Sequence, residues 1–405
     1  MSEQNTTISP GLQQWKTGLE SDLRNPIHLE NLRWHLPEGI SLDPLYDAGS
    51  LGPEHAYLQE FHQYWKSCKP HWKLQLKVSS LPSSGFTAEE TKEAERLGFV
   101  AWVGNVHPSA HSLPLENPFL GDPVSESLSR GQFSDSLKKL MAGEIPAELH
   151  INACAFHNAG ASLVEDLAYC LSLAAHYREL LGDEAFASMA DKIVLHLGTG
   201  SSLFLETARL RALRLLWMNF TSKCGLEKLP GNIQAESSLI DWSKTDPDGN
   251  LLRHTAAVMA SLLGAADAIL VNPHSLDQTL AMDAIRQSVN LGHLAMEEAQ
   301  MSKAFDPGSG SYLIEILTHE LSKKAWNLFC QWQEISLEEK LRSGFFVKMA
   351  EAGAQKLRLD FSEGRRVMTG VNKHPSPLSR PCPPWPSENP AEADFPALKP
   401  VFLDA

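Results

Sequence analysis

Residues 192–219 read KIVLHLGTGSSLFLETARLRALRLLWMN and combine a β-type run with a helical one. The run Lys192–Leu197 is short and mostly aliphatic, which predicts a buried strand. A turn rich in Gly and Ser follows, and the residues from about 203 to 219 then predict a helix. A strand joined to a helix in this way is one βα unit. Such units in series place their strands parallel, with right-handed crossovers.

The same alternation recurs on both sides of this unit, from about residue 146 to 300. Three further strand–helix pairs are predicted: 148–154 with 160–181, 232–235 with 250–263, and 268–271 with 279–300. Upstream, Lys73–Val78 and Gly98–Val103 are candidate strands, which gives six in all, two fewer than a closed (β/α)8 barrel needs. On the residues alone, the pattern fits either such a barrel or a doubly wound sheet.

Local composition divides the chain into four parts. Residues 1–70 are rich in Trp and His and predict an N-terminal arm with short helices, and residues 71–312 contain the βα units. Residues 313–374 are mostly helical in pattern. The remainder, 375–405, is a Pro-rich tail with nine of the 25 prolines. Because proline disfavours helices and central strands, we expect this tail to drape over the surface or to be disordered.

The composition indicates a soluble protein, with 43% apolar and 21% charged residues. The net charge of −14 argues against partners that need basic surfaces, namely nucleic acids and anionic membranes. A run of 18 apolar residues is lacking, and the start MSEQNTTISPGLQQW does not resemble a secretory signal, so we expect a cytoplasmic protein without a membrane span. The six cysteines never form CxxC, which disfavours a disulfide framework or a zinc cluster.

Two groups of residues could be either functional or purely structural. The turn His196–Ser202 lies where Gly-rich loops bind phosphate, but it lacks the residues of a P-loop or dinucleotide fingerprint, so we interpret it as a structural turn. Cys154 and His157 follow a predicted strand and could form a nucleophilic pair. If the strand continued, residues of opposite parity would diverge, so we favour a packed thiol and a hydrogen-bonded histidine.

The predicted helix 203–217 also contains four charged residues. They are Glu206, Arg209, Arg211 and Arg214. The spacing of three residues between Glu206 and Arg209 allows a local ion pair. We interpret the set as a solvated or subunit-facing helix surface. The 16 histidines show no HExxH or other ligand spacing, so no metal site is predicted.

Six strings resemble the methylmalonyl-CoA mutase family and occur in the family's order. They are EGISLDPLY at 38–46, AGAS at 159–162 with LAY at 167–169, LETARLRA at 205–212 with LW at 216–217, DP at 246–247 with NLLR at 250–253 and LG at 263–264, DPGSGSY at 306–312, and GVNK at 370–373. The family strings are EGI…PLY, EAGA…ELAY, MEIAKMRAARLLW, DP..N.LR…LGG, DPWGGSYY and GVNKY. Each string alone is weak, but six in order are specific. Between about 105 and 145 the resemblance nearly vanishes.

The resemblance implies a TIM-type barrel through which the pantetheine arm of an acyl-CoA passes. In the family, a separate C-terminal domain carries cobalamin, held by the histidine of a DxHxxG motif, and homolysis of the cobalt–carbon bond starts a 1,2-shift. We therefore expect an α/β fold of the (β/α)8-like barrel type, shortened or incomplete in its first half. An N-terminal arm precedes the barrel in this expectation, and helices follow it.

The sequence departs from the family where the chemistry takes place. Residues 154–155 are Cys-Ala where the family has its Tyr-His pair, so the histidine that polarises the substrate carbonyl is missing, and Asn158 replaces a glutamate. The family's catalytic tyrosine falls at Lys77 or Ser83, and an acidic residue is replaced by Lys244. Loss of one such donor costs roughly 10²–10⁴ in rate. We therefore expect no catalytic, cofactor-binding or metal-binding residue in this chain.

The resemblance thus implies a non-catalytic small subunit of a heterodimeric, adenosylcobalamin-dependent methylmalonyl-CoA mutase. The sequence has no DxHxxG and ends about 30 residues after GVNK, so we expect the cobalamin in the partner, a catalytic large subunit. The arm around Trp15 to Tyr46 is the expected element to wrap that partner. One alternative is an acyl-CoA mutase barrel that works with a separately encoded cobalamin-binding subunit. Another is a free-standing α/β protein with a Cys154–His157 site.

Overall fold

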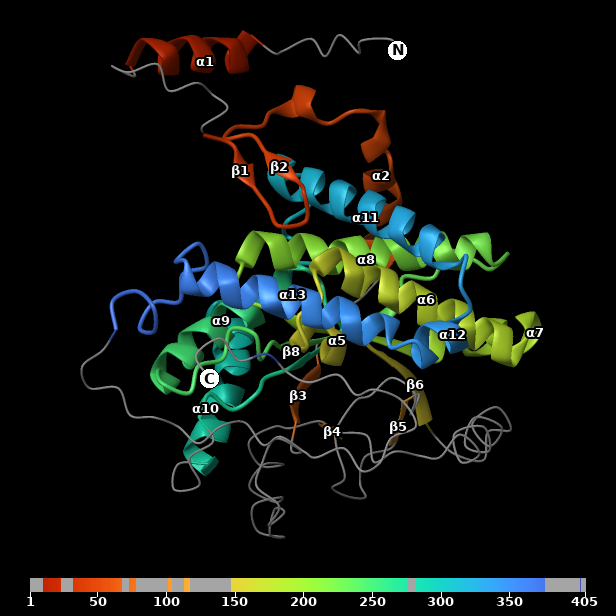
Figure 1. Ribbon diagram of the computed structural model, residues 1–405. Coiled ribbons are helices and arrows are strands. Elements are labelled where there is room, and N and C mark those ends of the chain that lie inside the picture. The colour runs from red at the N-terminus through yellow and green to blue at the C-terminus, as the bar shows by residue number, and fades with distance from the viewer. Residues whose placement is uncertain are drawn as a thin grey trace.

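A parallel sheet with helices packed on it forms the centre of the molecule (Figure 1). The computed structural model describes residues 10–22, 32–67, 73–77, 101–103, 113–116, 147–275, 281–375 and 401. Its parallel strands are β3 (Lys73–Lys77), β4 (Ala101–Val103), β5 (Leu113–Glu116), β6 (Ala147–Asn152), β7 (Ile193–Thr199), β8 (Asn232–Ser237) and β9 (Ala268–Leu270). Strands lie at all six predicted positions. The strand β5 was not predicted.

The strand order distinguishes between the two topologies that the sequence left open. Within the described residues the order is β4-β3-β9-β8-β7-β6-β5, and every neighbouring pair is parallel. From β5 to β9, strands that are neighbours in the sheet are also neighbours in the sequence. In addition, β3, the first strand of the sheet along the chain, pairs with β9, the last. This order is compatible with a barrel, in which first and last strands meet, and not with the reversal of a doubly wound sheet. The described contacts do not join β4 to β5, so closure is not shown.

Helices follow the strands as the βα pattern predicts. They are α5 (Cys154–Asn158), α6 (Leu163–Leu181), α7 (Asp183–Met189), α8 (Leu203–Lys223), α9 (Pro247–Leu263) and α10 (Ala281–His293), which a π-helical turn, Leu294–Glu298, extends. Local chemistry explains where two of them begin. The Ser162 hydroxyl accepts from the Glu165 N–H while the Glu165 carboxylate accepts from the Ser162 N–H, a capping box for α6. Asp246 caps α9, with Pro247 at its first position.

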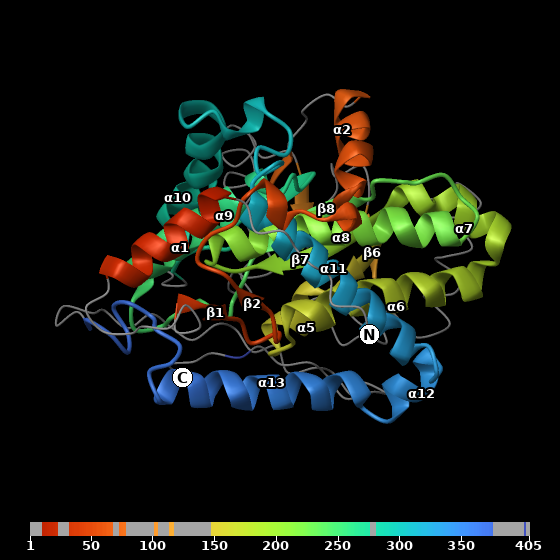
Figure 2. The ribbon, with the colours of Figure 1, turned by 90° about the horizontal axis from the view of Figure 1, so that it is seen from above.

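The hydrophobic core lies between the sheet and its covering helices. Alternate strand residues enter it, among them Leu149, Ile151, Ile193 and Leu195, all fully buried. A further helix, α11 (Tyr312–Trp332), packs on both α6 and α8, and Figure 2 shows it crossing over them. As a result, α8 is enclosed by α6, α9 and α11. This enclosure leaves little of α8 exposed to solvent.

The last helices are α12 (Leu337–Arg342) and α13 (Phe345–Ser362), and α13 packs directly on the loop after α5. Gly160 in that loop has a φ of +115°, which favours glycine. A Cβ atom at Gly160 would lie 2.6 Å from both the Ala350 carbonyl oxygen and the Ala354 nitrogen. The glycine in the AGAS string is therefore required for the close approach of α13.

The N-terminal arm contains more regular structure than its sequence suggested. It has α1 (Pro10–Asp22), an antiparallel hairpin of β1 (Trp34–His35) and β2 (Ser41–Leu42), 3₁₀ turns at Ala48–Ser50 and Pro53–His55, and α2 (Tyr57–Ser67). Leu36, Ile40 and Leu42 of the hairpin belong to the main hydrophobic core. The hairpin is thus anchored, while α1 lies farther out, at the top of Figure 1.

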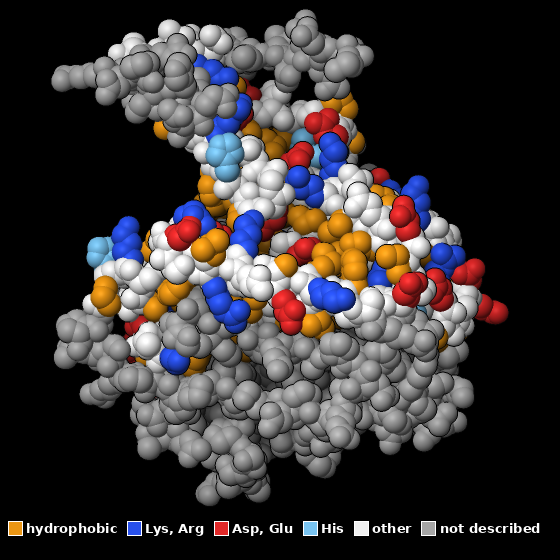
Figure 3. All heavy atoms as spheres, in the orientation of Figure 1, with side chains coloured by type: hydrophobic (Ala, Val, Ile, Leu, Met, Phe, Trp, Pro, Cys, Tyr) orange, Lys and Arg blue, Asp and Glu red, His pale blue; other side chains and the backbone are white. Residues whose placement is uncertain are grey.

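The Pro-rich tail is described at Val401 alone. This residue is buried, contacts Ala354 and Met368, and donates its N–H to the Asn158 carbonyl oxygen at 2.7 Å. The chain therefore returns to α5 at this point, and residues 376–400 and 402–405 of the tail lie outside the described residues. On the face shown in Figure 3, acidic and basic side chains are interspersed among apolar ones. None of the described helices has the length and hydropathy needed to cross a bilayer.

Candidate functional site

The strands β6, β7 and β8 carry polar side chains on the face that points away from the helices. Side chains alternate between the two faces of a strand, and the aliphatic ones face the helices. The other face carries His150, Asn152, His196, Gln234 and Glu236, all 9% exposed or less. Asn152 pairs in register with His196, and His196 pairs with Gln234, so the polar side chains lie side by side. This buried polar face is the candidate site.

Cys154 and His157 reach this region from one helical turn. The strand β6 ends at Asn152 and α5 begins at Cys154, so the condition under which the two side chains would diverge is not met. Both lie against Gly198 of β7: an added Cβ there would be 2.8 Å from His157 Cδ2 and 3.1 Å from Cys154 Sγ. Gly198 in the Gly-rich string therefore makes room for these two side chains.

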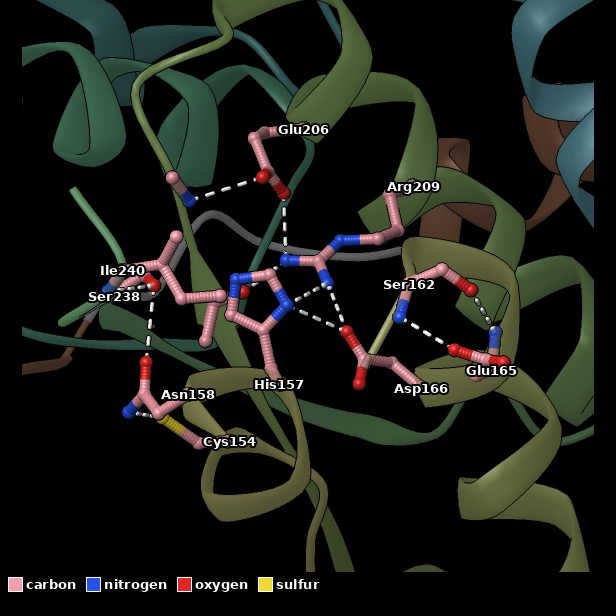
Figure 4. Close-up of polar contacts among 12 residues, drawn as sticks. Cys154, His157, Asn158, Ser162, Glu165, Asp166, Glu206, Arg209, Ser238 and Ile240 are labelled. Carbon is pink, nitrogen blue, oxygen red and sulfur yellow. Dashed lines mark hydrogen bonds and ion pairs between the residues drawn. The ribbon is translucent and has the colours of Figure 1, made fainter. Parts of the chain in front are cut away.

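His157 belongs to a buried ion network that joins α5, α6 and α8 (Figure 4). Its Nδ1 lies 2.8 Å from Asp166 Oδ2, and Arg209 Nη1 donates to the same oxygen at 2.8 Å. Arg209 Nη2 also pairs with Glu206 Oε2 at 2.7 Å and donates to the Gly198 carbonyl oxygen. Burial raises the pKa of Asp166, although His157 and Arg209 act to lower it. Opposite charges thus compensate one another inside the core.

Cys154 has a different neighbour. Asn158 Nδ2 donates to Cys154 Sγ at 3.4 Å, and Asn158 Oδ1 accepts from the Ser238 hydroxyl at 3.0 Å and from the Leu239 N–H at 2.9 Å. Figure 4 places Cys154 beside Asn158, and His157 beside Asp166 and Arg209. This geometry favours the interpretation of a packed thiol and a hydrogen-bonded histidine over a nucleophilic pair.

The turn before α8 is occupied by carboxylates of the chain itself. The Gly200 N–H donates to Glu206 Oε1 at 3.0 Å, and Ser201 donates to Asp241 Oδ2 through both its N–H and its hydroxyl. Arg366 pairs with Asp241 Oδ1 at 2.5 Å. Although burial opposes it, this pairing and the Ser201 donors hold the pKa of Asp241 below its usual value. Because these carboxylates would repel a phosphate group, the turn is structural.

The charges on α8 do not form a solvated or subunit-facing surface, so that prediction was wrong. Glu206 is 3% exposed, and the arginines Arg209, Arg211 and Arg214 are 2% exposed or less. Arg211 pairs with Asp306 and Glu315, and Arg214 pairs with Asp267 and the Ala265 carbonyl oxygen. The reason is the enclosure of α8 by three helices, which leaves these side chains no solvent to reach. The predicted ion pair between Glu206 and Arg209 is confirmed.

One group of potential metal ligands was not predicted from the sequence. Cys154 Sγ, a ring nitrogen of His196 and a carboxylate oxygen of Glu236 lie within 4.8 Å of one another, and all three residues are buried. Cys154 begins α5 just after β6, His196 lies in β7 and Glu236 lies near the end of β8, so no short spacing in the sequence could have revealed them. We call them the strand-end triad.

Comparison with known proteins identifies the family. The profile for methylmalonyl-CoA mutase matches residues 141–392, more than half of the chain. The chain belongs to the methylmalonyl-CoA mutase family. It is 28% identical to the methylmalonyl-CoA mutase small subunit of Porphyromonas gingivalis over 271 residues, 63% of this chain and 44% of that protein. It is 31% identical to the methylmalonyl-CoA mutase of Cereibacter sphaeroides over 251 residues, 57% of this chain and 34% of that protein.

A third relative is the probable methylmalonyl-CoA mutase small subunit of Mycobacterium tuberculosis. It is 30% identical over 271 residues, 62% of this chain and 42% of that protein. The chain thus spans less than half the length of these relatives. The resemblance stated from the six strings is confirmed at the level of the family.

The positions at which the sequence departs from the family can now be placed. Ala155, at the position of the family histidine, is partly buried and packs against the hydrophobic core. Asn158, at the position of a glutamate, holds Cys154 and the backbone after β8. The side chain of Lys77, and Ser83, lie outside the described residues. Around Ala155 the site therefore presents packing and internal hydrogen bonds.

A buried histidine on α9 gives the fold a predicted acid sensitivity. Burial, with a contribution from His274, lowers the pKa of His254 from 6.5 to about 4. Because the folded-state value is the lower one, the neutral ring contributes fully above about pH 6.5, and this stability is lost as the pH falls towards 4. We expect about 2–3 kcal/mol of the free energy of unfolding to disappear over that window. Chemical unfolding at pH 7 and 4.5 measures it.

His254→Gln isolates this contribution, since it should remove most of the change between the two pH values. His176→Gln, at a position of α6 where the side chain is 19% exposed, serves as the control and should leave the change intact. An equal pH dependence in the wild type and His254→Gln would contradict the assignment.

Proposed function

We propose that this chain is a non-catalytic small subunit of a heterodimeric, adenosylcobalamin-dependent methylmalonyl-CoA mutase, and that it stabilises a catalytic large subunit. The observation that carries the proposal is that the described side chains after β6 offer no free proton donor to a substrate. Ala155 offers no proton donor where the family has a histidine, and the polar groups of His157, Asp166 and Arg209 are hydrogen-bonded to one another. The small-subunit names of several relatives support the same assignment.

The strand ends of this chain do not fit the chemistry that adenosylcobalamin supplies. The radical rearrangement needs donors that face the thioester and a site that excludes water. Cys154 is packed with Asn158, and the helix α13 lies directly on Gly160 beside them. We therefore assign this cofactor to the partner, which would interconvert methylmalonyl-CoA and succinyl-CoA.

The remaining parts of the proposal concern architecture and location. We propose that the strands close into a TIM-type barrel between β4 and β5, and that the complex is cytoplasmic. The division into an arm (1–70), a barrel (71–312), a helical segment (313–374) and a tail (375–405) belongs to the same proposal. The arm would wrap the large subunit: its hairpin is held by the core at Leu36 and Ile40, while α1 lies farther out and could contact another chain.

Reconstitution tests the proposal. The full chain, a family large subunit with its cobalamin domain, and their mixture are each assayed for conversion of methylmalonyl-CoA with added adenosylcobalamin. We expect the isolated chain to show no turnover and to retain no cobalamin on gel filtration. We also expect it to co-elute with the large subunit and to raise the midpoint temperature for loss of that subunit's activity.

Two outcomes would overturn the assignment. Turnover by the isolated chain would show that it is a catalyst. Turnover on addition of a separate cobalamin-binding subunit alone would establish the split-enzyme alternative instead. Deletion of residues 1–31 provides a matched variant, because it leaves the hairpin intact. We expect it to weaken co-elution with the large subunit while the circular dichroism spectrum of the remaining chain keeps its shape.

A further inference from the structure

The strand-end triad combines three kinds of metal-binding atom in a buried position. Cys154, His196 and Glu236 are 2%, 2% and 1% exposed, and their sulfur, nitrogen and oxygen atoms lie within 4.8 Å of one another. Cys154 begins α5, whereas His196 and Glu236 lie in β7 and β8, so three backbone segments would be joined by one ion. The arrangement has no role in the network of His157, Asp166 and Arg209.

His196 gives an independent indication that an ion binds at the strand-end triad. Neither of its ring nitrogens has a hydrogen bond within the described part of the chain. Nε2 lies 2.9 Å from Glu236 Oε2, within ion-pair distance, but the two are not aligned as a hydrogen bond. A buried polar group without a hydrogen bond costs roughly 1–3 kcal/mol, and an ion between the ring and the carboxylate would remove this penalty.

The potential ligands are themselves held in place by amide side chains. Asn158 Nδ2 donates to Cys154 Sγ at 3.4 Å, and Asn272 Nδ2, just after β9, donates to Glu236 Oε1 at 3.0 Å. Such hydrogen bonds orient ligands and are typical of the shell around protein metal sites. They also leave the second carboxylate oxygen of Glu236 directed to His196.

We infer that the strand-end triad binds one divalent transition-metal ion of the Zn²⁺ class. The Cys154 thiolate, a neutral His196 nitrogen and the Glu236 carboxylate would supply three ligands, and water would complete a tetrahedron. A mixed set of sulfur, nitrogen and oxygen ligands suits Zn²⁺ better than Mg²⁺ or Ca²⁺. Binding releases the thiol proton to solvent, and two anionic ligands then balance the double positive charge.

The distances in the triad are compatible with this inference. Bonds of about 2.0–2.3 Å to the metal separate tetrahedral ligand atoms by roughly 3.3–3.8 Å. His196 Nε2 and Glu236 Oε2 are 2.9 Å apart, and no two of the three ligand atoms are more than 4.8 Å apart. Side-chain shifts of about 1 Å would therefore suffice, and the backbone of the three strands could stay in place.

Metal titration of the purified full chain tests the inference. Protein stripped with a chelator is titrated with Zn²⁺ alone and, separately, with Co²⁺ alone, and bound metal is measured after gel filtration. We expect one equivalent per chain, a thiolate-to-cobalt charge-transfer band and the intense visible bands of tetrahedral Co²⁺. We also expect Zn²⁺ to raise the unfolding temperature. Sub-stoichiometric binding, or a cobalt spectrum without the charge-transfer band, would overturn the inference.

Variants then assign the ligands. Cys154→Ser should lose the charge-transfer band and bind at least about 100-fold more weakly, and Asn158→Ala should keep the band but bind about 10–100-fold more weakly. Cys170→Ser is the matched control, because this thiol is also buried but belongs to the core on α6. Equal binding by both serine variants would refute the site. If Cys154→Ser fails to fold, the wild-type cobalt spectrum alone decides.

Discussion

Replacing Arg211 with methionine is expected to lower the free energy of unfolding by about 3–5 kcal/mol. The guanidinium donates to Asp306 Oδ1 at 2.7 Å, to Glu315 Oε1 at 2.8 Å and to the Thr318 hydroxyl at 3.0 Å. Burial acts to lower the pKa of Arg211, but Asp306 and Glu315 raise it above its usual value. Both acids are buried, so without the arginine two carboxylates would stay in the core uncompensated.

Urea unfolding followed by circular dichroism measures this loss. Arg178→Met is the control: its pair with Asp183 is exposed, so we expect a change of less than about 1 kcal/mol. Adding Glu315→Gln to Arg211→Met should recover part of the loss, because one stranded charge disappears. Equal effects of Arg211→Met and Arg178→Met would contradict the role assigned to the buried network.

The arginines show why the prediction of a solvated or subunit-facing surface on α8 was wrong. Charged residues on a helix usually mark its solvated face, and the prediction for α8 rests on that rule. At about 100° per residue, however, position 209 points roughly opposite to positions 211 and 214, whereas a single solvated face would group all three. That spread, together with the apolar residues Leu205, Leu210 and Trp217 on the same helix, indicated a helix enclosed on all sides.

The strands were predicted well where burial dictates them. The aliphatic residues of β6 and β7 lie on the face that helices cover, and β9 is wholly aliphatic; the period of the following helices was equally plain. By contrast, β5 reads Leu-Pro-Leu-Glu, and a proline inside a short run argues against a strand. The hairpin β1–β2 was also missed, because two-residue strands leave no alternating pattern to detect.

The candidate site could be predicted only in part. Cys154 and His157 were noticed because they follow a strand, but their partners Asn158 and Asp166 depend on a helix that begins at residue 154. The strand-end triad was beyond reach. Its members are 42 and 40 residues apart along the chain (154 to 196 to 236), and only the parallel register of three strands brings them together.

Arg209→Met should produce a second large loss, about 3–5 kcal/mol at pH 8, and this one should depend on pH. The variant leaves Asp166 fully buried and Glu206 nearly so, without the cation that both contact. Burial already raises the pKa of Asp166, and Arg209 is one of the groups that lower it. Removing the arginine should therefore raise this pKa further, so the folded variant takes up the Asp166 proton at a higher pH than the folded wild type does.

The sign of the pH effect follows from that proton. Where the folded variant binds more protons than the folded wild type, a falling pH stabilises the variant relative to the wild type. We expect the loss caused by Arg209→Met to be smaller at pH 5 than at pH 8, by about 1 kcal/mol for each unit that the pKa of Asp166 rises. Unfolding in urea at both pH values measures the difference. In an Asp166→Asn background the difference should vanish, because position 166 then has no proton to gain. A loss that is the same at pH 5 and pH 8 would mean that Asp166 keeps its charge without Arg209, and that His157 alone compensates it.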